Sequence, residues 1–107
     1  MIRLETCTES TIICRPVGAL DFNTATQLRH LVGEILPPNL DLILDLSLVN
    51  FIDAVGASAL VGSIRRVRAI GGRSGVSAVN PRIRWILDVI GIDGFFTYST
   101  PDEPDAA

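Results

Sequence analysis

The sequence predicts a single α/β domain in which a mixed β-sheet is covered by helices. Short apolar segments of strand-like composition alternate with segments whose apolar residues recur at helical spacing. Strands that alternate with helices pair in parallel through crossover connections. A length of 107 residues, with 48% hydrophobic and 20% charged residues, suits one compact domain with one core. The predicted element order is β-β-α-β-α-β-α, and a final short strand is an additional option.

The chain begins with two predicted strands, Ile2–Thr8 and 11–17, which flank a polar turn at residues 9–10. This arrangement predicts an antiparallel hairpin. Residues 18–21 (Gly-Ala-Leu-Asp) then break the strand pattern ahead of the first helix. Because the hairpin adds an antiparallel pair to an otherwise parallel sheet, we expect the sheet to be mixed.

The first predicted helix follows this break. Asn23 or Thr24 is its expected N-cap, because a short polar side chain can accept a hydrogen bond from the free N–H groups of a first helical turn. Pro37 and Pro38 end the helix, since proline cannot continue it. The residues expected to form its apolar stripe are Leu28, Leu31, Val32 and Ile35.

The most apolar segment of the chain, residues 40–46, predicts a central strand. Asp53 follows it in the position of an N-cap. A helical pattern then continues to Gly71 and Gly72, which are expected to terminate the second helix. Residues 75–79 are the next predicted strand.

The last predicted helix begins at the pair Asn80-Pro81, where asparagine is a favoured N-cap and proline fits the first helical position. Gly91 ends this helix, and residues 95–99 are the candidate final strand. The terminal residues are acidic and rich in proline, which is typical of a frayed tail. We therefore place the domain at residues 1–100 and the tail at residues 101–107.

The charge and hydropathy patterns argue against nucleic acid and membrane as partners. The net charge is −3 at pH 7, and the clustered arginines lack the interleaved aromatic residues of a base-stacking surface. Aspartates interrupt the most apolar region, so no membrane span is predicted. The N-terminus reaches Arg3 and Glu5 without the apolar segment of a signal peptide. We therefore expect a cytoplasmic protein.

No group of residues points to catalysis, so we predict a protein that is not an enzyme and has no cofactor or metal site. The motifs of phosphate-binding loops, dinucleotide-binding turns and zinc proteases are absent from the sequence. His30 has no nucleophile motif beside it. Asp41 and Asp45 alternate along one strand, which is more typical of a surface edge or a turn cap than of an acid pair. Cys7 and Cys14 are expected to be free thiols, although an oxidisable pair across the hairpin stays open.

The second predicted helix has an outer face of unusual composition. Leu60, Val61 and Ile64 fall on the same side as Ala57 and form the expected core stripe. A solvated helix would carry Glu and Lys on its other side. Instead, that side consists of small residues and ends in arginines: Val55, Ser58, Ala59, Gly62, Arg65, Arg66 and Ala69. This composition predicts a protein-binding surface, because small side chains allow another backbone to approach closely and arginines can anchor a partner.

Several segments of the chain also occur in a recognisable order. They are Gly18-Ala19-Leu20-Asp21; Asp45-Leu46-Ser47; Val49-Asn50-Phe51-Ile52-Asp53 with Gly56; the helix up to Gly71-Gly72; and Val79-Asn80-Pro81 with Leu87, Gly91-Ile92-Asp93 and Phe96. Together these segments span nearly the whole chain. They resemble the STAS domain family and, more narrowly, the anti-sigma factor antagonists of bacteria. The resemblance implies a small β-sheet covered by helices, in agreement with the element order above.

Family membership would imply a regulatory protein–protein interaction. In that family the antagonist binds an anti-sigma factor, often a serine kinase with the histidine-kinase-like ATPase fold, and so frees a sigma factor. Phosphorylation of a serine or threonine at the start of the second helix, usually within Asp-Ser-[Ser/Thr]-Gly, breaks the complex. Here the matching residues are Asp53-Ala54-Val55-Gly56. Val55 has no hydroxyl group, so the resemblance implies an antagonist without this phosphorylation switch. Ser58 does not match the acceptor position. We interpret it first as a small residue of the outer face and keep it only as a secondary candidate for phosphorylation.

The resemblance and the outer face together predict the partner-binding residues Asp21, Asp53, Ala54, Val55, Gly56, Ser58, Gly62 and Arg66. Two alternatives remain. In the first, the chain is a STAS scaffold subunit of a larger complex, such as a lipid-transport or stressosome-like assembly. In the second, it is a nucleotide-sensing STAS domain. Pairing of the small apolar face with itself in a homodimer also stays open.

Overall fold

The computed structural model describes residues 2–77 and 81–90. The predicted α/β class and the mixed sheet are confirmed. Asn80, Gly91, the candidate strand at 95–99 and the tail at 101–107 lie outside the described residues. In chain order the elements are β1 (Ile2–Thr8), β2 (Thr11–Pro16), β3 (Gly18–Leu20), α1 (Phe22–His30), the π-helical turn η1 (Leu31–Ile35), β4 (Asp41–Asp45), β5 (Val49–Ile52), α2 (Ala54–Ala69), β6 (Ser74–Ser77) and α3 (Pro81–Ile90).

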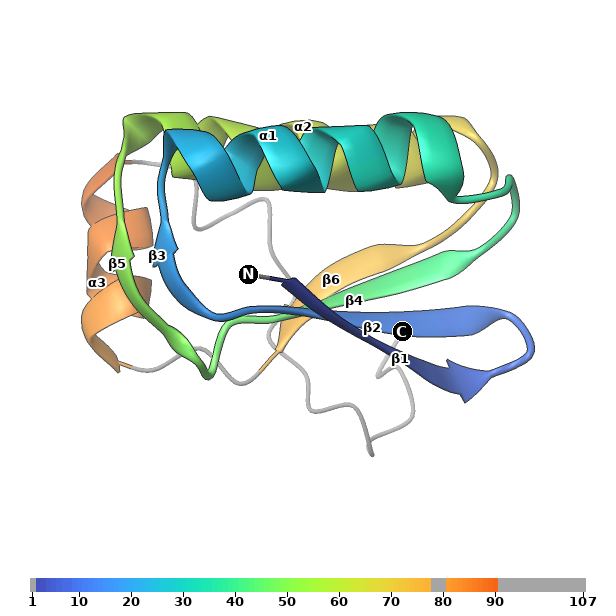
Figure 1. The fold of residues 1–107 in the computed structure, drawn as a ribbon, viewed down its shortest axis with the longest axis horizontal. Helices are drawn as coiled ribbons and strands as arrows, with labels where there is room; N and C mark the ends of the chain where they lie inside the picture. Colours follow the sequence, from blue (N-terminus) through green and yellow to red (C-terminus); the bar gives the residue numbers. More distant parts are fainter. Residues whose placement is uncertain (1, 78–80, 91–107) are drawn as a thin grey trace.

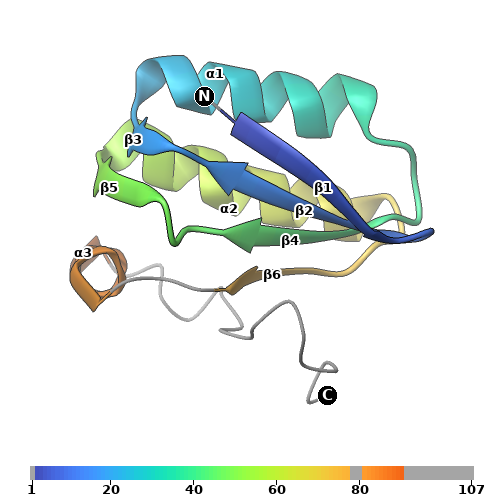
Figure 2. The ribbon, with the colours of Figure 1, turned by 60° about the horizontal axis from the view of Figure 1, so that its bottom comes forward.

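The main sheet has four strands in the order β1-β2-β4-β6. β1 and β2 form the predicted antiparallel hairpin, whereas β2 pairs with β4 and β4 with β6 in parallel. α1 and α2 lie side by side on one face of this sheet, and α3 lies at one end of the molecule beside β5 (Figure 1 and Figure 2). The two long helices therefore present one continuous layer to the outside.

Two of the strands, β3 and β5, are not among the predicted elements. They pair with each other in parallel as a separate two-stranded sheet in which Leu20 lies opposite Ile52. With only three and four residues, they are too short to show a strand pattern, so pairing between distant segments defines them. β3 leads into α1 and β5 leads into α2, so this small sheet brings the two helix starts together (Figure 1).

The hydrophobic core lies between the main sheet and the two long helices. Leu42 and Leu44 of β4 pack with Leu28 of α1 and with Leu60 and Ile64 of α2, and all five side chains are almost completely buried. Burial of each such side chain is worth about 1.5–3 kcal/mol relative to its exposure. This layer is therefore the main source of the fold's stability.

The start of α1 differs from the prediction that Asn23 or Thr24 is its N-cap. Asp21 is the cap, and its carboxylate accepts hydrogen bonds from the N–H groups of Asn23 and Thr24 at 3.1 and 3.4 Å. Asp21 has the extended backbone of a cap residue (φ −114°) because it directly follows β3. The helix therefore begins two or three residues earlier than the local polar residues indicate.

The end of the first helix also corrects one prediction. Leu28, Leu31 and Val32 are buried as expected, but the Ile35 side chain is 59% exposed. The helix closes in the π-helical turn η1, where the Leu36 N–H donates to the Leu31 carbonyl group at 3.0 Å. The additional residue in this turn rotates Ile35 away from the core.

Both predicted boundaries of α2 are confirmed. The Asp53 carboxylate accepts a hydrogen bond from the Gly56 N–H at 2.8 Å and so caps the N-terminus. At the other end, the Gly72 N–H donates to the Val67 carbonyl group and the Gly71 N–H to that of Arg68. Gly71 has a φ of +94°, a conformation that glycine adopts without steric cost.

α2 buries a wider arc than its predicted core stripe. Ala57, Leu60 and Ile64 are buried as expected and Val61 is half-buried, but Ala59 is completely buried, although we had placed it on the outer face. α1 packs alongside α2, so α2 has neighbours on two sides, the sheet and α1. A helical wheel that assumes one core side cannot anticipate this second contact. Ala59 therefore does not belong to the exposed side of α2.

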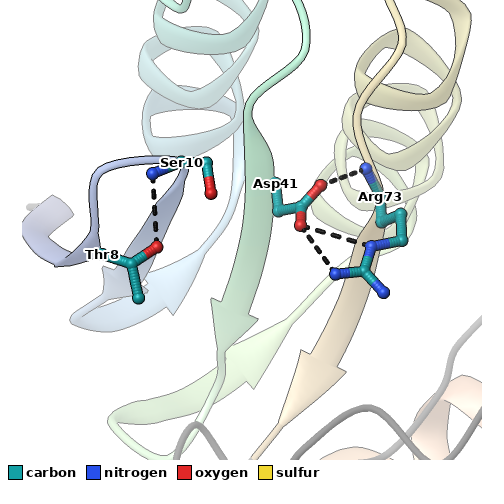
Figure 3. Close-up of polar contacts among 4 residues, drawn as sticks. All are labelled: Thr8, Ser10, Asp41 and Arg73. Atoms are coloured by element: carbon teal, nitrogen blue, oxygen red, sulfur yellow. Dashed lines mark hydrogen bonds and ion pairs between the residues drawn. The ribbon is translucent and has the colours of Figure 1, made fainter.

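Asp41 connects three segments at the end of the main sheet where β4 begins (Figure 3). Its carboxylate accepts a hydrogen bond from the Arg73 backbone N–H at 2.8 Å and two from the Arg73 guanidinium at 3.1 and 3.3 Å. Its own N–H donates to the Ser10 carbonyl group at 2.7 Å, and the Ser10 N–H donates to the Thr8 hydroxyl at 3.2 Å. Asp41 therefore has a structural role rather than that of one member of an acid pair.

The two cysteines cannot form the oxidisable pair that the sequence left open. Cys14 lies opposite Leu4 in the hairpin, whereas Cys7 lies at an irregularity near the turn. Three residues of strand separate Leu4 from Cys7, which corresponds to about 10 Å. A disulfide needs Cα atoms within about 7 Å of each other. Cys14 is also buried and Cys7 exposed, and both are free thiols.

Candidate protein-binding surface

Asp21 and Asp53, the two aspartates among the predicted partner-binding residues, lie at the same end of the molecule, where α1 and α2 begin. The Asp53 N–H donates to the Leu20 carbonyl group at 3.4 Å, which ties the residue before α2 to the end of β3. Asp21 follows Leu20 directly, so the two caps belong to neighbouring helix starts (Figure 1). Each cap is worth about 1 kcal/mol, and each carboxylate lies at the positive end of a helix dipole. Asp21 and Asp53 therefore set the position of both first turns.

Most of the predicted partner-binding residues on α2 lie on one accessible face. Ala54, Val55, Ser58, Gly62 and Arg66 are all exposed. Ala54, Ser58, Gly62 and Arg66 follow one another at four-residue spacing along one side of the helix, and Val55 lies beside them, three residues before Ser58. Val55 is 37% exposed. A Cβ atom at Gly62 would meet nothing within 4 Å, so the surface there is open. We call these five residues the α2 face.

Gly56 differs from its neighbours, because it is buried. A Cβ atom at this position would lie 1.9 Å from the Leu20 carbonyl oxygen. Gly56 thus allows the first turn of α2 to pack directly against β3. It determines where the exposed Val55 is presented and contributes no side chain to the surface.

Two aromatic residues at the same end of the molecule escaped the sequence reasoning. Phe22, the first residue of α1, is 66% exposed, and Phe51 of β5 is 51% exposed. Phe22 follows the capping Asp21, and Phe51 precedes Asp53 by two residues. Their sequence pattern gives no signal, because a phenylalanine next to a strand or helix start is ordinarily a core residue. Together with Val55 they are exposed apolar residues at the end where both helices begin, and we call these three residues the cap-end surface.

The arginines of α2 lie toward its opposite end. Arg65 and Arg66 are exposed. Arg68 donates a hydrogen bond to the Ser74 carbonyl group at 3.3 Å and so lies toward β6. The outer side of α2 therefore changes from apolar at its start to basic at its end.

Comparison with known proteins reveals relatives over most of the chain. A curated protein of Lysinibacillus sphaericus named "Anti-sigma F factor antagonist" is 23% identical over 103 residues, which is 94% of this chain and 88% of that protein. The crystal structure of an anti-sigma factor antagonist from Mycobacterium paratuberculosis is 27% identical, with a TM-score of 0.73 over 92% of this chain and 83% of that chain.

The same fold occurs in a protein of another kind. The crystal structure of a sulfate transporter family protein from Wolinella succinogenes has a TM-score of 0.76 and 22% identity, covering 87% of this chain and 76% of that chain. Within the described residues, no helix of the present protein has the length and apolarity needed to cross a bilayer. The family model described as "STAS domain" matches residues 4–104, and the chain therefore belongs to the STAS domain family.

Proposed function

We propose that this STAS domain binds an anti-sigma factor through the cap-end surface and the α2 face, and so regulates sigma-factor-dependent transcription. The observation that carries the proposal is the exposure of Phe22, Phe51 and Val55 at the end where both helices begin. Apolar side chains exposed together on a small protein mark a binding surface. The names of the antagonist relatives support the same activity. The protein acts by binding and catalyses no reaction.

The proposed partner is an anti-sigma factor of the serine-kinase type. Val55 determines how the complex with this partner can be regulated. A phosphate on the first turn of α2 would add about −1.5 to −2 charges beside Asp53 and oppose an apolar interface. Val55 has no hydroxyl group that could accept the phosphoryl group. The complex therefore persists in the presence of ATP, and its control lies in the amount of antagonist or in its partner.

The test is calorimetry with kinase-type anti-sigma factors of the same genome, in the presence of ATP and Mg²⁺. Wild type should bind without acquiring phosphate, and Val55→Asp should weaken binding at least about tenfold, equivalent to 1.4 kcal/mol. Ile35→Asp is the matched control, because Ile35 is 59% exposed in η1, which follows the end of α1 that lies farthest from both helix starts. The proposal is wrong if none of these anti-sigma factors binds, or if both variants weaken binding equally.

A second candidate function is that of a scaffold subunit in a larger assembly, which the likeness to a sulfate transporter family protein favours. Such a subunit would use the same surface but would remain in a stable, stoichiometric complex. Purification of the tagged protein at its native level distinguishes the two. A transport-type complex that survives dilution supports the scaffold, whereas an anti-sigma factor that exchanges with added antagonist supports the antagonist.

A further inference from the structure

The helical layer carries charge of one sign. α1 and α2 contain Arg29, Arg65, Arg66 and Arg68 and no aspartate or glutamate. The whole chain, by contrast, has 12 acidic and 9 basic residues. All four arginines are exposed. The two helices run in the same direction, so these arginines collect at the end of the layer that lies away from the cap-end surface (Figure 1).

Three acidic side chains lie near this end of the molecule: Glu9, exposed in the turn between β1 and β2, and two that have basic partners. Glu34 in η1 pairs with His30 at 2.8 Å. Asp41 at the start of β4 pairs with Arg73 at 3.1 Å. The four arginines of α1 and α2 outnumber these three carboxylates, so the helical end of the molecule carries more positive than negative side chains.

Stabilisation of the helix ends explains only part of this charge. A helix C-terminus carries roughly half a negative charge, which a cation in the last turn complements. α2 has three arginines in its last five residues, well beyond that amount. Arg68 hydrogen-bonds to Ser74 and contributes to the fold. Arg65 and Arg66 are both exposed near the end of α2.

We infer that the partner of this surface is a protein with an acidic patch that lies against Arg29, Arg65 and Arg66, while an apolar group of that partner meets the cap-end surface. The inference rests on the surface used in the proposed function and adds the chemistry and the orientation of the partner. Complementary charge accelerates the encounter and fixes the orientation of two proteins. Association therefore slows as salt screens these charges, because the Debye length is only about 3 Å at 1 M salt.

The arrangement of the charges favours a protein over a membrane or a nucleic acid. A membrane-surface helix places its basic residues beside an aromatic or aliphatic face that enters the lipid. Here the exposed Phe22 and Phe51 lie at one end of the helical layer and the arginines at the other. A single-stranded nucleic acid needs aromatic rings interleaved with the cations. A protein surface, apolar at one end and acidic at the other, fits the observed pattern.

The first experiment needs no natural partner. The full-length ¹⁵N-labelled protein is titrated with poly-L-glutamate at low salt and again at about 1 M NaCl, where screening is strong. We expect amide shifts at Arg29, Arg65 and Arg66 that disappear at high salt. The double variant Arg65→Gln/Arg66→Gln should bind at least about fivefold more weakly, a loss of nearly 1 kcal/mol. Arg82→Gln on α3 is the control. It should change the affinity less than about twofold, because a single exposed charge outside the binding surface contributes little free energy.

Three results would overturn the inference. The first is the absence of poly-L-glutamate binding, and the second is an equal loss of affinity in the Arg82→Gln control. The third is binding to phosphatidylglycerol-containing vesicles with no response to poly-L-glutamate, which would identify a membrane surface instead. Thermal unfolding of each variant verifies that the fold is retained.

A second experiment separates this inference from the proposed function. Association rates with the kinase-type anti-sigma factors are measured as a function of salt for wild type and for the double variant. If an anti-sigma factor binds both proteins with the same salt dependence, the acidic-partner inference is wrong and the antagonist function stands. If poly-L-glutamate binds at the arginines but no anti-sigma factor binds, the function is wrong and the basic surface stands.

Discussion

Gly56 at the start of α2 packs against the main-chain carbonyl group of Leu20 in β3, and a Cβ atom at position 56 would lie 1.9 Å from that oxygen. The contact joins the α2 face to the small sheet that carries both helix starts. Gly56→Ala must therefore displace α2 or β3. We expect it to lower the free energy of unfolding by about 1–3 kcal/mol, the usual cost of overpacking, as measured by urea denaturation.

Gly62→Ala is the matched control for this substitution, because a Cβ atom there meets nothing within 4 Å. Alanine is favoured over glycine in a helix interior by about 1 kcal/mol, so this variant should be more stable than wild type. Equal destabilisation by the two substitutions would show that Gly56 has no special contact.

Arg15 and Asp45 form an ion pair on the sheet face that points away from α1 and α2. Arg15 donates to the Asp45 carboxylate at 2.8 Å and also pairs with Glu5. Burial by itself would raise the pKa of Asp45, but hydrogen bonds from Ser47 and Arg15 outweigh this effect and hold the pKa below its usual value. A carboxyl group with a lowered pKa stabilises the fold above its unfolded-state pKa of about 3.9 and loses that contribution as the pH falls through its folded-state pKa.

Asp45→Asn should therefore lower the free energy of unfolding at pH 7 by about 2 kcal/mol, the worth of a hydrogen bond to a charged group. It should also flatten the decline of stability below pH ~4. Asp41→Asn removes the more exposed pair with Arg73 and should cost no more than about 1 kcal/mol. Urea denaturation between neutral and acidic pH measures both effects. If the stability of Asp45→Asn falls with decreasing pH as steeply as that of wild type, the lowered pKa of Asp45 does not stabilise the fold.

The two thiols should differ sharply in reactivity. Burial raises the pKa of the Cys14 thiol to about 12, so almost no reactive thiolate forms near neutral pH. Cys7 is exposed. We expect one thiol to react rapidly with a disulfide reagent in the native protein and two to react in denaturant. Rapid modification of both thiols under native conditions, or an intramolecular disulfide detected by mass spectrometry, would refute this.

Restoring a hydroxyl group at position 55 should restore the phosphorylation switch. Val55 is 37% exposed in the first turn of α2, so serine fits there without disturbing the core. We expect Val55→Ser to acquire one phosphoryl group from a cognate kinase-type anti-sigma factor and ATP, as detected by mass spectrometry, and then to be released. Wild type should remain unmodified, and a Val55→Ala control separates loss of the apolar contact from gain of the acceptor. Phosphorylation of the wild type, at Ser58 or elsewhere, would contradict the proposal that this protein lacks the switch.

The local signals of the sequence predicted most boundaries correctly. Asp53 caps α2, and the pair Gly71-Gly72 ends it, because capping and left-handed conformations depend on the chemistry of a few neighbouring residues. The exposed residues of the α2 face follow from the same helical spacing, whereas Gly56 and Ala59, which were also predicted for the outer surface, are buried. Asp21 was recognised only as part of a motif, and its capping role emerged from the end of β3.

Only the tertiary structure decided the features that depend on distant segments. β3 and β5 become strands because they pair with each other across almost thirty residues of chain. Ala59 is buried because α1 packs beside α2, and the exposure of Phe22 and Phe51 depends on how the two helix starts meet. By itself, then, the sequence determined the fold class, both ends of α2 and most of its outer side, since each follows from short-range chemistry. The pairing of the helix starts and the surface they expose required the folded chain, because contacts between remote residues leave no periodic signal in the sequence.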